Sequence, residues 1–395
     1  MEIKNYEYVL VPNILREYRC HSSGECCQSK WRIDIDKVAF DKTKQELDKL
    51  NENIDTYVTS HENGTYTSKF ADGYCKFITN DKLCRIHRDF GWDCLSDTCK
   101  VYPRLLKLTS RGMEMGFVFS CRSSAKLLLK NQKIEILKVK KDELFFMKPS
   151  TASFIIPENN LDTSVQRRYY ELEEFLISLL NENGSIGEKL HYAHECLKEL
   201  YSLSDAREYK FKDALKKYRK FLPKKLDRDQ VNDILIKTIL SKQQDGAKVV
   251  ATELINLLKL VKLHNDLEKD RELLRDDSFS LEPKELDDLK SLWNERYENV
   301  LKNYVACVIF TKDFYYSREY ATVKTLLLVS MLKLRILLNK KYMKRELTDD
   351  ELIFTIKSHD NDFSHGGDFF NNFYRENRSG FTAEEYIEKI VTFLR

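Results

Sequence analysis

The cysteines of this chain are concentrated near its N-terminal end, and this crowding constrains the fold more than any other feature of the sequence. Eight of the ten cysteines lie within the first 121 residues, and the remaining 274 residues contain only Cys196 and Cys307. The densest stretch is 75–104, CKFITNDKLCRIHRDFGWDCLSDTCKVYPR. In a reducing compartment, thiols clustered in this way are typical of a metal site.

The sequence predicts a cytoplasmic protein with reduced thiols. The first residues, MEIKNYEYVLVPNI, show no basic leader followed by a sustained apolar core. The longest apolar run, 326–338, is interrupted by Ser330, Lys333 and Arg335. It is shorter than the roughly 20 residues that a membrane span needs. We therefore expect no membrane partner.

The charge balance excludes a strongly basic or acidic protein. Lys and Arg number 66, Asp and Glu number 63, and the net charge is +3. Such a balance gives no general attraction to nucleic acid or anionic lipid, so we expect no nucleic-acid partner. The length of 395 residues allows two or three domains. The oligomeric state does not follow from these features.

The periodicity of apolar residues predicts a mainly α protein in two parts. An irregular α+β, cysteine-rich domain is expected over residues 1–155, and a multi-helix bundle over residues 156–395. Apolar residues at spacings of three and four predict helices at 163–181, 186–203, 205–222, 229–241, 247–268, 283–310, 318–338 and 382–394. We expect 283–310 and 318–338 to form the buried centre of the bundle.

Within the cysteine-rich domain, the pattern predicts short elements. These are a strand at 31–36, a helix at 38–60, and strands at 115–120 and 134–139.

A hairpin is predicted over residues 75–86, with Asn80-Asp81 as its two-residue turn. Phe77 would then face Cys84, and Cys75 would face Ile86. Both sulfurs would lie on one face of the hairpin, with Cα atoms roughly 7–8 Å apart. Cys75 and Cys84 are therefore expected to serve one metal centre.

Seven cysteines are the candidate metal ligands: Cys20, Cys26, Cys27, Cys75, Cys84, Cys99 and Cys121. A disulfide between the adjacent Cys26 and Cys27 would be strained, whereas two neighbouring thiolates suit a polymetal centre. All-thiolate sites hold zinc or an iron–sulfur cluster. The CxxC…CxxC pattern of a zinc ribbon is absent, and seven thiols exceed the four ligands of one zinc. Both points favour a cluster or two sites.

The other candidate ligands are weaker. His21 and His87 are secondary candidates, and Cys94 is left out of the set. Cys196 and Cys307, each within a predicted amphipathic helix, are expected to be buried core residues.

Four segments resemble the flagellin lysine N-methylase family. They are CCQSKWRIDID (26–36), YCKFITNDKLCRIHRDFG (74–91), LSDTCKVYPR (95–104) and SCRSSAKLLL (120–129), and the resemblance covers roughly residues 8–130. These segments also contain an element similar to the iron- or zinc-chelating CxxCxxxxCC pattern. The chain departs from the family by lacking a second cysteine soon after Cys20, and by having Arg122 where proline is common.

The resemblance implies a protein-lysine N-methyltransferase. Such an enzyme transfers methyl groups from S-adenosylmethionine to lysine side chains of flagellin, a protein of the bacterial flagellum. The resemblance also implies a [4Fe-4S] cluster on the seven cysteines named above, with zinc as the alternative metal.

Other sequence features limit the mechanism. No glycine-rich strand–turn–helix fingerprint is present, which argues against a Rossmann-type methyltransferase fold. The CxxxCxxC triad of radical enzymes is also missing. With 21 tyrosines and 63 acids, the sequence identifies no catalytic residue. Arg104 either pairs with a structural carboxylate or binds the carboxylate of the methyl donor.

Two further interpretations remain open. The segment SHDNDFSHGGD contains His359, Asp360, Asp362 and His365, and we interpret it as a polar loop in preference to a metal site. A non-enzymatic protein, either a zinc or iron sensor or carrier or a structural zinc adaptor, is the alternative to the methyltransferase.

Overall fold

The computed structural model describes residues 7–21, 23–28, 33–109, 111–144, 168–203, 208–220, 293–311 and 318–364. The chain forms two compact units that are not continuous in sequence. The first unit comprises 1–127, 136–158 and 356–365; the second comprises 128–135, 159–355 and 366–395. The predicted helices at 229–241, 247–268 and 382–394 lie outside the described residues.

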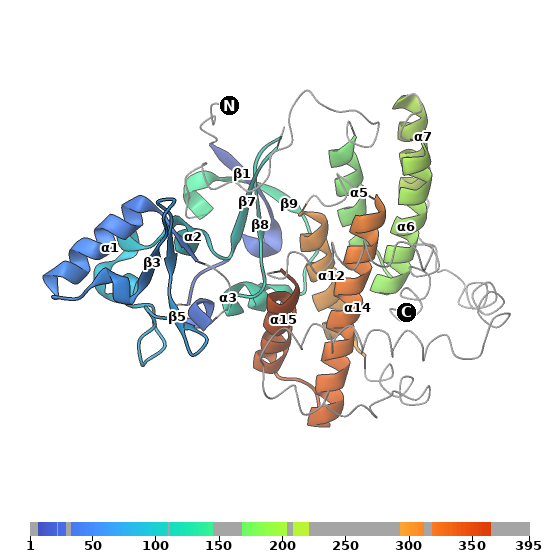
Figure 1. The fold of residues 1–395 in the computed structure, drawn as a ribbon. Helices are drawn as coiled ribbons and strands as arrows, with labels where there is room; N and C mark the ends of the chain where they lie inside the picture. The colour runs from blue at the N-terminus through green and yellow to red at the C-terminus, as the bar shows by residue number, and fades with distance from the viewer. Residues whose placement is uncertain are drawn as a thin grey trace. The chain divides into compact units, whose positions relative to one another are not determined.

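The described part is a mixed α+β structure, with the predicted α+β organisation near the N-terminus and helices after it; the overall description as mainly α is too strong. The difference arises because the first unit contains a four-stranded sheet. Its strands are β1 (Tyr8–Pro12), β7 (Arg104–Thr109), β8 (Gly112–Phe117) and β9 (Ile136–Lys140), in the order β7-β8-β1-β9 (Figure 1). β1 is parallel to β8, and the other two pairs are antiparallel. β8 and β9 overlap predicted strands, whereas β1 and β7 were not predicted.

The cysteine-rich part of the first unit is built from short elements around its own hydrophobic core. Its strands form a three-stranded sheet, β2-β4-β3, and a two-stranded sheet, β5-β6. In chain order the elements are η1 (Asn13–Leu15), η2 (Glu25–Gln28), β2 (Asp34–Ile35), α1 (Lys37–Lys49), η3 (Ile54–Thr56), β3 (Val58–Ser60), β4 (Tyr66–Ser68), β5 (Phe70–Ala71), β6 (Tyr74–Cys75), η4 (Ile86–Phe90), η5 (Trp92–Cys94) and α2 (Asp97–Val101). The short helix α3 (Arg122–Ala125), η6 (Lys126–Leu129) and η7 (Lys141–Leu144) follow later in the chain.

The helix predicted over 38–60 is shorter in the structure. α1 begins after Asp36, whose side chain accepts a hydrogen bond from the Ala39 backbone amide, and it ends at Lys49. The chain leaves the helix through Asn51, which has a φ of 57°. Asparagine tolerates this left-handed conformation, and it ends the helix here. Ile54, predicted on the helix, is buried but lies in η3.

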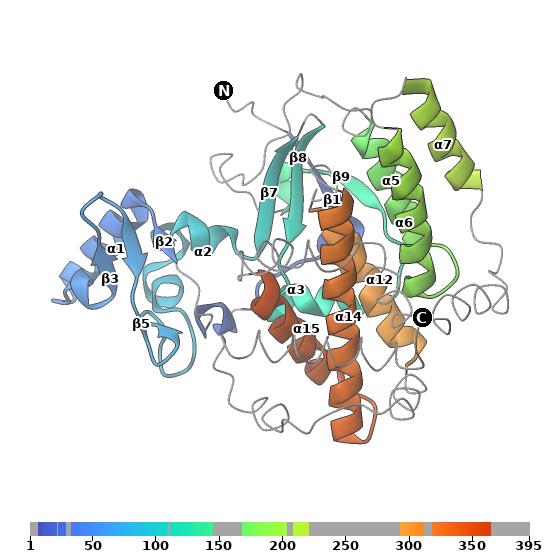
Figure 2. The ribbon, with the colours of Figure 1, turned by 45° about the vertical axis from the view of Figure 1, so that its right-hand side comes forward.

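The described helices of the second unit include α5 (Tyr169–Leu180), α6 (Ile186–Ser202), α7 (Glu208–Lys220), α12 (Glu295–Ile309) and α14 (Arg318–Met343). α12 contacts α14, α5 and α6, and α6 also contacts α7 (Figure 2). Tyr297, Val300 and Leu301 of α12 are fully buried. Among the described helices of this unit, α12 and α14 lie at the centre, as predicted.

Helix α15 (Asp349–Ser364) begins in the second unit and ends in the first. Thr348 starts it with a capping box, because the Thr348 hydroxyl accepts from the Glu351 amide and the Glu351 carboxylate accepts from the Thr348 amide. The helix continues through His359 and Asp360, which are buried. The prediction of a polar loop here is therefore wrong for the described residues. No helix in the described ranges is long and apolar enough to cross a membrane.

Candidate metal centre

Four cysteine thiols come together around Cys27. The Cys27 side chain hydrogen-bonds with those of Cys26, Cys75 and Cys84. Cys26 and Cys27 lie in η2, Cys75 ends β6, and Cys84 follows the loop after β6. All four belong to, or pack against, the same hydrophobic core. Distant segments of the first unit therefore deliver four thiols to one place.

A different hairpin from the predicted one brings Cys75 to this position. β5 and β6 pair antiparallel, so that Cys75 faces Phe70 and not Ile86. Their turn is Asp72-Gly73, with φ values of 52° and 80°. Asp-Gly favours this left-handed two-residue turn, which explains why it determines the pairing and Asn80-Asp81 does not.

Cys84 is positioned by a compact loop. Cys84 forms a single antiparallel bridge with Ile78, where the prediction paired it with Phe77. The Thr79 amide donates to the Leu83 carbonyl at 2.9 Å, and the Lys82 amide donates to the Thr79 carbonyl at 2.8 Å. The predicted register was wrong by one residue, but the two sulfurs still reach the Cys27 thiol.

Gly24 allows η2 to approach this loop closely. Gly24 has a φ of 66°, and a β-carbon there would lie 1.5 Å from the carbonyl oxygen of Lys82. No L-side chain fits in that space, so only glycine permits the contact. The meeting of Cys26 and Cys27 with Cys84 therefore depends on a residue without a side chain.

The thiols around Cys27 have unequal acidities. Hydrogen bonding to the other thiols, that to Cys26 being the largest cause, raises the pKa of Cys27, so this thiol keeps its proton. The same hydrogen bonds lower the pKa of Cys26 and Cys75, and lower that of Cys84 from 9.0 to about 7. One protonated thiol thus stabilises thiolate character in its neighbours, which is the form that binds metals.

Cys99 lies close to this group on α2. The Ser96 hydroxyl caps α2 by accepting from the Cys99 amide, and Asp36 accepts from the Asp97 amide at 2.9 Å. Burial raises the pKa of the Cys99 thiol, and charge on Cys84, Cys26 or Cys75 raises it further. Cys99 is thus a fifth thiol within electrostatic range of the group.

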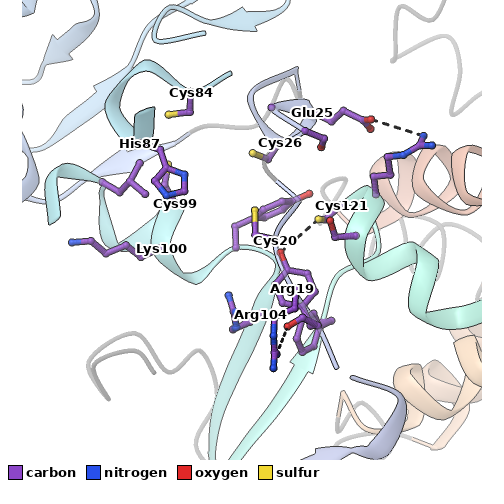
Figure 3. Close-up of a pocket in the computed structure, with 18 of the residues that line it drawn as sticks. Arg19, Cys20, Glu25, Cys26, Cys84, His87, Cys99, Lys100, Arg104 and Cys121 are labelled. Carbon is purple, nitrogen blue, oxygen red and sulfur yellow. Dashed lines mark hydrogen bonds and ion pairs between the residues drawn. The ribbon is translucent and has the colours of Figure 1, made fainter. Parts of the chain in front are cut away.

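Cys20 and Cys121 lie by Tyr18. The Tyr18 hydroxyl is 3.9 Å from the Cys121 sulfur, and both cysteines act electrostatically on that hydroxyl. Burial is the main cause that raises the pKa of Tyr18 and of Cys121. Figure 3 shows Cys84 and Cys99 on one side of a pocket and Cys121 on the other, with Cys26 and Cys20 between them.

All these thiols except that of Cys75 line one cavity of about 880 Å³. The six cysteines on its wall are Cys20, Cys26, Cys27, Cys84, Cys99 and Cys121. Cys75 instead lines a smaller, apolar cavity of about 30 Å³ together with Cys27, Cys84, Cys94 and Cys99. The larger volume lies in the range of small-molecule sites, about 300–1,000 Å³.

The cavity wall also carries cations. Arg16, Arg19, Arg88, Lys100, Arg104 and Arg122 line it, against the carboxylates of Glu25 and Glu143. This excess of positive charge is suited to thiolates or to another anion.

Arg104, the predicted donor-binding residue, begins β7 and faces this cavity. Its guanidinium carbon lies 4.7 Å from the centroid of the Tyr18 ring. Burial lowers the pKa of Arg104, while Tyr18, Cys20 and Cys121 act in the opposite direction. Arg104 thus lies beside Tyr18, Cys20 and Cys121 at the cavity. Its binding of a methyl donor stays a prediction.

The remaining cysteines and the two histidines differ from the main group. Cys196 and Cys307 are buried in α6 and α12, as predicted. The His21 ring nitrogen Nδ1 lies 2.9 Å from the Ser123 hydroxyl. The His87 ring packs edge-on against Trp92.

The thiols are grouped but do not form a ready coordination sphere. Within the described ranges, no group of three or more His, Cys, Asp or Glu side chains is arranged to hold a metal ion. Cys26, Cys75 and Cys84 all hydrogen-bond to the Cys27 thiol. Their chemistry, an all-sulfur donor set, nevertheless fits zinc or an iron–sulfur cluster.

Sequence reasoning missed the residues that support this site. Tyr18, Gly24 and Asp360 have no sequence signal that marks them as neighbours of cysteines. The one available hint was the aspartate- and histidine-rich segment at 358–368, which was interpreted as a loop. The central place of Cys27 among the thiols was also not predictable from spacing.

Comparison with known proteins finds partial similarity. Over 105 residues the chain is 28% identical to the flagellar biosynthetic protein FliU of Salmonella muenchen, covering 24% of this chain and 62% of FliU. It is also 28% identical over 105 residues to the lysine-N-methylases of Salmonella typhimurium strain LT2 and Salmonella choleraesuis strain SC-B67, covering 26% of each. The match thus spans about a quarter of the length of these methylases. No protein-family model and no solved structure matches the chain.

Proposed function

We propose that this chain is a protein-lysine N-methyltransferase that transfers methyl groups from S-adenosylmethionine to lysine side chains of flagellin. The observation that carries the proposal is the cavity in which six cysteines share a wall with Arg104 and Tyr18. The partial similarity to lysine-N-methylases supports the reaction type. The similarity to a flagellar biosynthetic protein supports flagellin as the substrate. The reducing cytoplasm is the compartment that suits these free thiols.

The chain's thiols would hold a [4Fe-4S] cluster in this proposal. The candidate ligands are those predicted from the sequence, Cys20, Cys26, Cys27, Cys75, Cys84, Cys99 and Cys121. The cationic wall favours the thiolate form of these ligands, and the dry core behind Cys75 limits access of water. A bound cluster would supply an anionic anchor that fixes the cysteine-bearing loops around the cavity.

Arg104 is the proposed partner of the donor's carboxylate. A guanidinium presents two parallel N–H donors that match a carboxylate, and partial burial strengthens this contact. The aromatic and apolar residues beside it, Tyr18, Met115 and Phe117, offer a surface for the donor's adenosine.

The chemical step requires a neutral lysine placed in line with the donor's methyl group. The lysine ammonium first loses a proton to solvent water; its nitrogen then forms a bond to the methyl carbon as the carbon–sulfur bond of the donor breaks, and S-adenosylhomocysteine leaves. Burial raises the pKa of Tyr18 and Tyr102, so both hydroxyls stay protonated. They can donate hydrogen bonds but do not accept the lysine proton. The chain's main contribution is therefore positioning and desolvation.

A direct assay tests the proposal. The protein, purified without oxygen, is incubated with radiolabelled S-adenosylmethionine and purified flagellin, and label on lysine is measured. We expect transfer by the intact chain, loss of transfer in Cys27→Ser, and retained transfer in Cys307→Ala, which alters a cysteine of the second unit. Absence of transfer by metal-loaded protein would contradict the methyltransferase proposal.

A second candidate function is a non-enzymatic zinc or iron protein, either a sensor or carrier or a structural adaptor. The observation that favours it is the tight gathering of Cys26, Cys75 and Cys84 around Cys27, because one zinc takes four sulfur ligands at about 2.3 Å. A brown protein with broad absorbance at about 400 nm would support the iron–sulfur cluster. A colourless protein with one zinc per chain would support this alternative.

A further inference from the structure

The last turns of α15 contact both loops that carry cysteines into the cavity. Asp360 accepts hydrogen bonds from the backbone amides of Phe119 and Ser120, at 2.7 and 2.8 Å. Lys357, one turn earlier, donates to Glu25 at 2.5 Å. Glu25 directly precedes Cys26, and Ser120 directly precedes Cys121. All of these residues belong to the first unit.

The Asp360 contacts are buried and geometrically demanding. Phe119, Ser120 and Asp360 are 2%, 0% and 3% exposed. A buried amide without an acceptor is costly, and a single carboxylate oxygen here serves two successive amides. The backbone direction just before Cys121 is therefore set by a residue 240 positions later in the chain.

Other bonds complete the loop but do not replace these two. The Ser124 hydroxyl donates to the carbonyls of Val118 and Cys121, at 2.7 and 2.9 Å. The Tyr102 and Ser120 hydroxyls lie 3.0 Å apart. The Ser124 hydroxyl binds backbone carbonyls, and the Tyr102 hydroxyl binds the Ser120 side chain. Asp360 instead accepts from the backbone amides of Phe119 and Ser120, so none of these other bonds duplicates its role.

The Lys357 contact is also shielded. The side chains of Lys357 and Glu25 are 16% and 23% exposed. Arg122, immediately after Cys121, approaches the other oxygen of Glu25 at 4.0 Å. Glu25 thus lies between a cation of α15 and a cation of α3, and it links the Cys26 loop to the Cys121 loop.

We propose that Lys357 and Asp360 are positioning residues, which together form a clamp that fixes where the Cys26 and Cys121 thiols point in the cavity. This role concerns the chain's own residues and extends the proposed function. It does not need the methyl donor or flagellin to be correct. In the metal-loaded protein, the same clamp would hold two of the predicted ligands.

Thiol reactivity of the metal-free protein tests the clamp. Metal is removed with a chelator under reducing conditions, and the alkylation rate of each cysteine is followed by mass spectrometry. We expect Asp360→Ala to raise the rate at Cys121 about tenfold, because loss of a buried hydrogen-bond acceptor frees the loop to open. Asp360→Asn keeps one acceptor oxygen and should give a smaller increase. Asp350→Asn, at the exposed start of the same helix, should change nothing.

Two internal comparisons separate the clamp from a general loss of structure. Cys196 and Cys307 report opening of the second unit, so their rates should stay at the wild-type value in every variant. Lys357→Met and Glu25→Gln should each speed alkylation of Cys26, and the double variant should be little faster than Glu25→Gln alone, because both changes break the same contact. An unchanged Cys121 rate in Asp360→Asn and Asp360→Ala, or an unchanged Cys26 rate in Lys357→Met, would overturn the proposal.

This outcome is distinguishable from failure of the methyltransferase proposal. If the clamp is present but the chain transfers no methyl group, the thiol rates will still change as described. If the chain is a methyltransferase without a clamp, activity will be present and the Cys121 rate will not respond to Asp360.

Discussion

The cysteines of the first unit and those of the second are the same residue type in opposite settings. Cys196 and Cys307 are buried within the helices α6 and α12. Burial there raises the pKa of Cys196. Cys26, Cys75 and Cys84 come from short, irregular elements, and hydrogen bonding to Cys27 lowers their pKa despite burial.

The contrast shows that burial alone does not determine the chemistry of a thiol. An isolated buried cysteine is a small apolar residue, whereas a buried cysteine beside another thiol shares its proton and gains thiolate character. Irregular elements make this possible, because loops and short strands can direct several side chains to one place. A long helix places neighbours on a fixed cylinder and offers fewer ways to converge.

Replacement of Cys27 should have the largest effect on the difference between the cysteines of the two units. We expect Cys27→Ser to abolish metal binding, because it removes the side chain that links three others. Metal analysis and the visible spectrum measure the loss. Cys307→Ala, in the second unit, serves as the control and should retain full metal content. Equal metal content in the two variants would contradict a special role for Cys27.

The close approach at Gly24 should have the next largest effect. An alanine in the left-handed conformation costs about 1–2 kcal/mol. Gly24→Ala is expected to lower the unfolding free energy by more than this, because its β-carbon would also clash with Lys82. We expect metal binding to fall as well. Gly64→Ala is the matched control: Gly64 also has a positive φ, 77°, but has no atom within 4 Å of a β-carbon. Denaturant unfolding measures the unfolding free energy of both variants. A similar decrease in Gly24→Ala and Gly64→Ala would mean that the close approach of Gly24 to Lys82 is unimportant.

Substitution of Arg104 should separate donor binding from the thiols. Arg104→Lys retains the charge but loses the two-donor geometry, so affinity for S-adenosylmethionine should fall about tenfold. Calorimetric titration measures the affinity, and metal content should be unchanged. Wild-type affinity in the variant would remove Arg104 from the donor site.

In the metal-free protein, the pH dependence of the alkylation rate should distinguish Cys84 of the first unit from Cys196 of the second. The pKa of Cys84 is lowered to about 7 by its hydrogen bond with Cys27, so its thiolate forms as the pH rises through that value. The alkylation rate of Cys84 should increase with a midpoint near pH 7. Cys196, whose pKa is raised by burial, should not react over pH 6–9. In Cys27→Ala, the Cys84 midpoint should move up toward its ordinary value of 9.0.

The smallest effect is expected in the helical unit. Cys196→Ala should lower the unfolding free energy by about 1–2 kcal/mol, because it leaves a small cavity in a packed core. Thermal unfolding measures this change. Metal content and methyl transfer should match the wild type; a loss of metal would place Cys196 in a site that its surroundings do not indicate.

The helical part was predictable because its signal is local and repeated. The apolar spacing located α6 and α14 within about five residues, whereas α12 begins at Glu295, well after the predicted start at 283. The same spacing singled out α12 and α14, which contact each other, as the centre of the described helices. The same reasoning extended α1 too far, since a single asparagine at position 51 was enough to end it. It also missed β1 and β7, because a five- or six-residue apolar run has no distinct period.

The candidate site was predictable in composition but not in arrangement. Cysteine density indicated that seven cysteines would lie near one another, and six of them line one cavity, while Cys75 reaches the Cys27 thiol from the smaller cavity beside it. The pairing that brings Cys75 there was wrong, because the Asp72-Gly73 turn outweighs the weaker Asn80-Asp81 signal. Partners from distant segments, such as Asp360, lie beyond what spacing in one sequence can indicate.

The distance along the chain between Ser120 and Asp360 has a consequence for how the protein is made. Ribosomes add about 5–20 residues per second, so about 12–48 seconds separate the emergence of the two. During that interval the Cys121 loop exists without its acceptor, while the cysteines before it have already been synthesised. Metal loading that requires the Cys121 loop in its final arrangement must therefore wait until the segment that carries Asp360 has been synthesised.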